Sequence, residues 1–92
     1  MTKQEAEEVA EILSQLGNPI RLAILLQLQK QDWLTGADLL SPSAKSNINF
    51  HEHLKALQDI GLVQRKMRGT KFVYSLSDDR LNQVLDLVAT LK

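Results

Sequence analysis

The sequence contains no cysteine, so it can form no disulfide, no thiol redox switch and no thiolate metal site. Aromatic residues make up only 4% of the chain, which argues against a protein built around stacking on bases or sugars. No apolar run approaches the roughly 18 residues that a membrane span needs, and residues 1–5 lack the apolar core of a signal peptide. We therefore expect a cytoplasmic protein without a membrane partner.

Charge is balanced over the whole chain but segregated along it. The 92 residues have a formal net charge of zero and the length of one domain near the lower limit of independent folding. Residues 1–13 carry four glutamates against one lysine, whereas residues 41–75 carry six Lys or Arg against two acids and are net positive by four. Four of these cations fall between residues 65 and 71, so the sequence predicts one strongly basic segment.

Apolar periodicity predicts helices over residues 2–16, 19–30, 36–40, 46–60 and 78–91. Gly17 ends the first helix, and Asn18 and Pro19 start the second, because Asn caps well and Pro is tolerated at the first helical position. Thr35 can cap the third helix, Ser46 the fourth, and Ser77 or Asp78 the last.

The fourth helix has two distinct faces. Phe50, Leu54 and Leu57 form its core face, and Gly61 stands at its C-terminal cap. Residues 62–68 and 70–76 then form two short strands around a glycine, which predicts a hairpin. The fold is therefore expected to be mainly α-helical with one small β-hairpin, a single winged helix-turn-helix domain over residues 1–92. Trp33, which precedes the third helix, is expected to be a partly buried packing residue.

A winged helix-turn-helix binds double-stranded DNA with its recognition helix in the major groove and its wing on the adjacent backbone or minor groove. The fourth helix presents short polar and cationic side chains for this task, and the wing adds salt-dependent affinity. The candidate DNA-binding residues are Lys45, Ser46, Asn47, Ile48, His51, Lys55, Arg65, Lys66, Arg68 and Lys71.

Several stretches together resemble the ArsR/SmtB family of bacterial repressors. Residues 16–25, Leu-Gly-Asn-Pro-Ile-Arg-Leu-Ala-Ile-Leu, are similar to the segment that opens that family's fold. Residues 53–57, 61–63 and 69–76 resemble the end of its recognition helix and its wing, in the same order and spacing. The resemblance implies a homodimer, joined through its first and last helices, that represses transcription at an inverted-repeat operator.

Three departures from the family pattern concern its metal sites and its turn. The family's Cys-x-Cys pair is missing from residues 32–38, and no histidine follows Asp78 and Asp79, which are better explained as helix-capping residues. His51 and His53 cannot share one metal, because residues two apart on a helix point about 200° apart. We therefore expect no metal and no other cofactor. The turn from Leu40 to Ser46 is longer than the family's compact Gly-Leu-Ser connection.

Apolar stripes on the helices at residues 2–16 and 78–91 exceed what a chain of this length can cover, which predicts a homodimer through these two helices. The candidate interface residues are Val9, Leu13, Leu81, Val84, Leu85 and Val88. An alternative reading is a winged-helix module that binds protein and does not read DNA, although such a module has no need of an acid-free cationic hairpin. No catalytic constellation is present, so an enzyme is not expected, and the sequence does not reveal an inducer.

Overall fold

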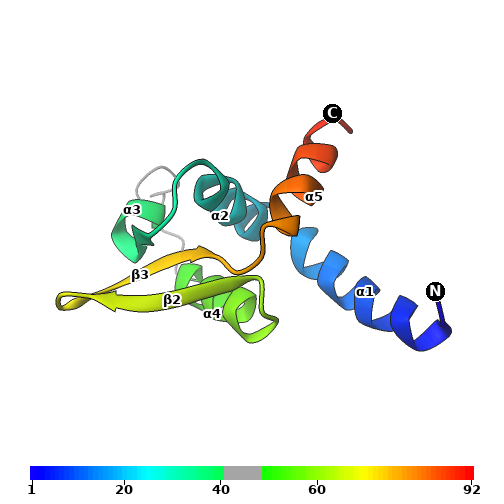
Figure 1. The fold of residues 1–92 in the computed structure, drawn as a ribbon, viewed down its shortest axis with the longest axis horizontal. Helices are drawn as coiled ribbons and strands as arrows, with labels where there is room; N and C mark the ends of the chain where they lie inside the picture. The colour runs from blue at the N-terminus through cyan, green and yellow to red at the C-terminus, as the bar shows by residue number, and fades with distance from the viewer. Residues whose placement is uncertain (41–48) are drawn as a thin grey trace.

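A computed structural model describes residues 1–40 and 49–92 of the chain (Figure 1). The elements are α1 (Lys3–Leu16), α2 (Pro19–Lys30), β1 (Leu34–Thr35), α3 (Gly36–Leu40), α4 (Phe50–Asp59), β2 (Val63–Arg68), β3 (Lys71–Leu76) and α5 (Arg80–Ala89). This order confirms the predicted mainly helical fold with a small antiparallel hairpin. The predicted helix cap at Ser46 lies outside the described residues, within which α4 begins at Phe50.

Side-chain caps define the starts of α1 and α2. The Thr2 hydroxyl accepts a hydrogen bond from the Glu5 N–H at 3.0 Å, and the Glu5 carboxylate accepts one from the Thr2 N–H at 2.9 Å. This capping box lowers the pKa of Glu5. Asn18 Oδ1 accepts from the backbone N–H groups of Ile20 and Arg21, as predicted for the start of α2.

No single helix of the described segments is long and apolar enough to cross a membrane, and α1 and α2 pass that test only as a pair bent by 87°.

A third strand, which the sequence reading missed, lies before α3. Leu34 pairs with Tyr74 and Thr35 with Val73, so the sheet has the order β1-β3-β2. Two residues are too short to show an alternating pattern, so no sequence signal predicts this strand. Thr35 also caps α3 as predicted, because its hydroxyl accepts from the Asp38 N–H while the Asp38 carboxylate accepts from the Thr35 N–H, both at 3.1 Å.

Glycines with positive φ end α4 and turn the hairpin. Gly61 has φ +84°, and its N–H donates to Gln58 while the Leu62 N–H donates to Leu57. These two bonds define a Schellman motif, with the buried Leu57 and Leu62 providing its usual apolar contact. Gly69 has φ +65° in the two-residue turn between Arg68 and Lys71. The strands therefore cover slightly less than the predicted 62–68 and 70–76.

The core forms where α2 and α4 pack against the sheet and α5. The predicted core face of α4 is buried in it, together with Ile24, Leu25 and Leu28 of α2. Leu81 and Leu85 of α5 are also part of this core, with 8% and 1% of their surface exposed. This corrects the prediction that they face a partner chain, because their surface is already covered by their own chain.

The two terminal helices leave the body of the protein in different ways. α1 projects outward, and Leu16 is its only buried residue (Figure 1). At the start of α5, the Asp78 carboxylate accepts from the backbone N–H of Arg80 and pairs with its guanidinium at 2.6 Å. Hydrogen bonds from the Arg80 side chain and backbone lower the pKa of Asp78. Asp79 occupies the N-cap position but makes no side-chain cap hydrogen bond, so the capping carboxylate is that of the expected Asp78, one residue earlier.

Candidate nucleic-acid interface

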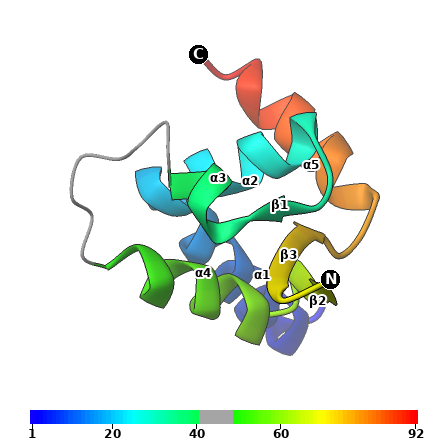
Figure 2. The same cartoon turned by 90° about the vertical axis from the view of Figure 1, so that its left-hand side faces the viewer.

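The helix α4 and the β2–β3 hairpin lie next to each other on one side of the molecule, with α2 and α5 on the other (Figure 2). These two elements carry the described part of the predicted DNA-binding set. His51 and Lys55 of α4 are exposed, as are the four hairpin cations. The remaining predicted residues, Lys45, Ser46, Asn47 and Ile48, lie outside the described residues.

The apolar face of α4 determines which of its polar side chains point to solvent. Phe50, Leu54 and Leu57 are at most 2% exposed and form the buried face. His51 follows Phe50 and is therefore rotated away from this face along the helix, so its side chain is exposed. His53 is different, because it is half-buried and its Nδ1 accepts a hydrogen bond from Arg21 Nε of α2 at 2.9 Å. The two histidines thus have separate roles, and His53 fastens α4 to α2.

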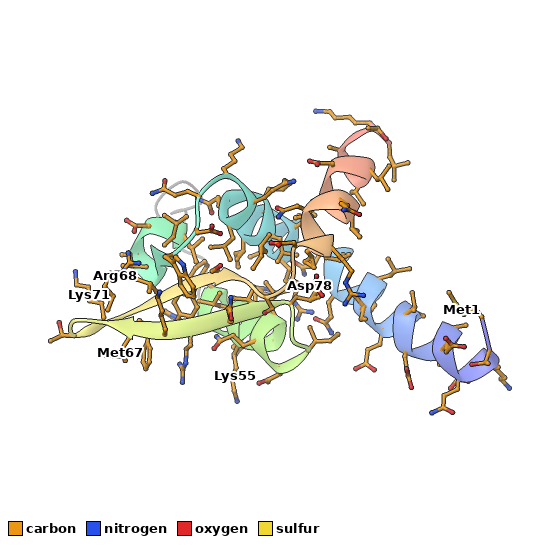
Figure 3. All side chains as sticks on the ribbon, in the orientation of Figure 1. Met1, Lys55, Met67, Arg68, Lys71 and Asp78 are labelled. Atoms are coloured by element: carbon orange, nitrogen blue, oxygen red, sulfur yellow. The ribbon has the colours of Figure 1, made fainter. Side chains whose placement is uncertain are left out.

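Strand register divides the hairpin cations between two faces. Arg65 pairs with Tyr74 and Met67 with Phe72, and these four side chains share one face. Lys66, Arg68 and Lys71 belong to the opposite face of the same hairpin. Figure 3 shows this division at the tip, where Arg68 and Lys71 extend to one side and Met67 to the other. The basic segment of the sequence is therefore not one continuous patch.

Aromatic rings hold two of these cations in place. The Arg65 guanidinium lies over the Phe72 ring, 4.1 Å from its centroid, and Lys66 Nζ lies 3.9 Å from the centroid of Trp33. Trp33 is half-buried, as predicted, but its φ of +61° places it in the left-handed region that bulky residues rarely adopt. Trp33 thereby links the turn after α2 to the wing, a role that the sequence reading missed.

Within the described residues, no carboxylate forms an ion pair with a cation of α4 or of the hairpin. Across residues 1–40 and 49–92, the only ion pair joins Arg80 to Asp78 at the start of α5. The cations of α4 and the hairpin therefore keep their charge available to an external anion. In the same described ranges, no three His, Asp or Glu side chains come close enough to hold a metal ion.

A crevice of about 300 Å³ separates α4 from β2. His51, Lys55 and Asp59 of α4 line one wall, and Arg65 and Tyr74 line the sheet side. Since the three α4 residues are spaced by four, they form one row along the helix. The crevice brings cationic groups from two elements to one place, which the sequence reading treated as separate sets.

No family model matches the chain, but individual proteins do. The chain is 35% identical to the HTH-type transcriptional regulator NmtR of Mycobacterium tuberculosis over 86 residues, covering 94% of this chain and 71% of NmtR. It is 30% identical to an uncharacterized HTH-type transcriptional regulator of Methanocaldococcus jannaschii over 88 residues, covering 96% of this chain and 99% of that protein.

The fold is also that of known winged-helix structures. The homodimeric winged helix-turn-helix DNA-binding domain of Mb0332 from Mycobacterium bovis superposes with a TM-score of 0.82 at 22% identity, over 99% of this chain and 86% of that domain. The order of elements, the hairpin beside α4 and these relatives agree with the resemblance found in the sequence. The chain therefore belongs to the ArsR/SmtB family of winged helix-turn-helix DNA-binding transcriptional regulators.

Proposed function

We propose that the protein is a homodimeric repressor that binds an inverted-repeat operator through α4 and the β2–β3 hairpin, without a metal cofactor. The observation that carries this proposal is the placement of α4 beside a hairpin whose four cations are exposed and free of carboxylate partners within the described ranges. The family consists of regulators and not enzymes. Acting on DNA places the protein inside the cell.

The proposed DNA contacts divide into two kinds. Residues near the start of the recognition helix, including His51 and the undescribed Asn47, would read base edges in the major groove. The hairpin cations would bind phosphates or the adjacent minor groove and so provide most of the salt-dependent affinity. Lys45, Ser46 and Ile48 stay in the proposed contact set on sequence grounds alone.

The proposed dimer interface consists of α1 and α5. Their exposed apolar side chains have no cover in the single chain: Leu13 and Leu87 are 55% and 68% exposed, and Leu91, just beyond the end of α5, is 83% exposed. Val9 and Val84 are more than one-third exposed, and Val88 is half-buried. Isolated chains rarely leave so much apolar surface on two helices. The homodimeric state of the Mb0332 domain, which shares this fold, supports pairing with a second copy.

Selection of bound duplexes from a random DNA pool tests this proposal. A two-fold dimer should enrich an inverted repeat whose half-sites are about one helical turn apart, because operator symmetry mirrors protein symmetry. A reporter gene placed behind the selected site should then be expressed less when the protein is present. Failure to enrich any sequence, with the protein folded, would instead favour the protein-binding winged-helix module.

A further inference from the structure

We propose that the crevice between α4 and β2 binds one phosphate of the duplex backbone, and that Arg65 and Lys55 hold it from opposite sides. This inference rests on the proposed DNA-binding function and extends it, because it assigns Arg65 to a site with α4 and not to the wing tip. The partner is duplex DNA, recognised here through its backbone charge.

The crevice offers convergent donors at a suitable place. Lys55 and His51 come from α4, Arg65 comes from β2, and all three are exposed at the crevice of about 300 Å³. Figure 3 shows Lys55 and Met67 on the same side of the molecule, away from Arg68 and Lys71. Because Arg65 shares the face of Met67, it belongs with Lys55.

Phe72 orients the arginine before DNA arrives. The ring lies 4.1 Å from the guanidinium carbon of Arg65 and is itself 42% exposed. Stacking occupies the flat face of a guanidinium and leaves its N–H edges available for bidentate bonds to a phosphate. Stacking on Phe72 therefore reduces the conformational entropy that Arg65 loses when it binds a phosphate.

The way a winged helix docks on DNA would bring a backbone phosphate to this crevice. When a recognition helix enters the major groove and a wing reaches the adjacent minor groove, a sugar-phosphate strand runs between them. A crevice located between α4 and the first wing strand faces that strand. Lys66 does not take part, because it lies over Trp33 on the opposite face of the hairpin.

A substitution of Asp59 should change the affinity for DNA in the opposite direction to a substitution of Arg65. It is an exposed carboxylate that lines the same crevice, and it would repel a bound phosphate. Replacing it with asparagine should therefore tighten binding to duplex DNA, whereas Arg65→Gln should weaken it. Lys92→Gln is the matched control, because it also removes one positive charge but lies at the C-terminus, away from α4 and the hairpin (Figure 1).

The experiment is a methylphosphonate scan of a selected duplex, in which one backbone phosphate at a time is made neutral. Dissociation constants are measured by fluorescence anisotropy for the wild type, Arg65→Gln, Asp59→Asn, Arg68→Gln and Lys92→Gln. At one phosphate in each half-site, the wild type should lose affinity by about tenfold or more. Arg65→Gln should bind the normal duplex about tenfold more weakly and be insensitive to neutralisation of that same phosphate. Arg68→Gln should keep the sensitivity, and Lys92→Gln should match the wild type.

The outcomes separate this inference from the proposed function. If the folded wild type binds no duplex, the function itself fails. If the wild type binds but Arg65→Gln keeps full affinity, or the effects of Arg65→Gln and every neutral phosphate simply add, the crevice site is overturned while DNA binding stands. Weaker binding by Asp59→Asn would also contradict the site. Circular dichroism of each variant shows whether a loss of affinity comes from unfolding.

Discussion

Replacing Leu87 with alanine tests the proposed dimer at its most informative position. Leu87 and Leu85 are two residues apart on α5 and therefore point in nearly opposite directions. Leu85 is 1% exposed in the core, whereas Leu87 is 68% exposed on the other side of the helix. Truncation of Leu87 should consequently weaken association and leave the fold of each chain intact.

The size of the effect follows from the surface that remains exposed. Complete burial of a leucine side chain contributes about 1.5–3 kcal/mol, so the two-thirds of Leu87 still exposed could contribute about 1–2 kcal/mol. Two-fold symmetry places two copies in the interface, which gives about 2–4 kcal/mol for the dimer. The dissociation constant should therefore rise by a factor of about 30 to 700.

Sedimentation velocity over a concentration series measures this constant directly. Ala89→Ser is the control, because Ala89 is exposed on a different side of α5 and should leave association unchanged. Circular dichroism should show wild-type helix content for both variants. Equal dissociation constants for Leu87→Ala and the wild type would refute the proposed interface, as would a folded wild type that stays monomeric at high micromolar concentration.

Three further predictions concern the stability of the fold. Gly61→Ala should lower the free energy of unfolding by about 1–2 kcal/mol, because alanine disfavours the positive φ of this position. An added Cβ would meet nothing within 4 Å at Gly61 or at Gly36, so Gly36→Ala, where φ is not positive, is the control and should not lower it. Arg21→Ala and His53→Ala should each cost about 0.5–1.5 kcal/mol, and a double-mutant cycle by urea unfolding should show their effects to be non-additive. Asp78→Asn should destabilise the protein at neutral pH and not in acid, because a carboxylate with a lowered pKa contributes stability that is lost as the pH falls through that pKa; equal effects at both pH values in thermal melts would contradict this.

Local rules predicted the elements well where a residue has one dominant conformational preference. Asn18 and Thr35 cap helices as expected, and Gly61 takes the left-handed conformation that ends α4. The spacing of Phe50, Leu54 and Leu57 predicted the buried face of α4 correctly. Each of these features depends on groups within a few residues of one another, which is the range over which sequence patterns are informative.

Apolar patterning could not distinguish the two kinds of burial on α5. Leu81 and Leu85 pack into the chain's own core, whereas Val84 and Leu87 are exposed. Leu81, Val84 and Leu85 belong to one apolar stripe in the sequence, and the hydrophobic effect does not depend on which chain covers the surface. The positions of α2 and the sheet determine which residues of the stripe are buried within the protomer.

The cationic segment shows a similar limit, although here the sequence held a usable signal. Alternation along a strand separates Arg65 from Lys66 and Arg68, so the division between faces follows from the predicted hairpin alone. What the sequence could not provide is the tertiary partner of each face. Arg65 meets α4 across the crevice, and Lys66 meets Trp33, whose left-handed backbone has no sequence signal.

The zero net charge does not weigh against DNA binding, because the two sets of charges are held apart. The N-terminal half of α1, with its glutamates, and the hairpin tip lie at opposite ends of the molecule's longest axis, which measures 43 Å (Figure 1). Charges in physiological salt are screened over about 8–10 Å. A phosphate at the hairpin tip therefore experiences the nearby cations and hardly the glutamates in the N-terminal half of α1 in the same chain. Local charge at the contact surface determines the electrostatic free energy of binding, and the sum over the sequence does not.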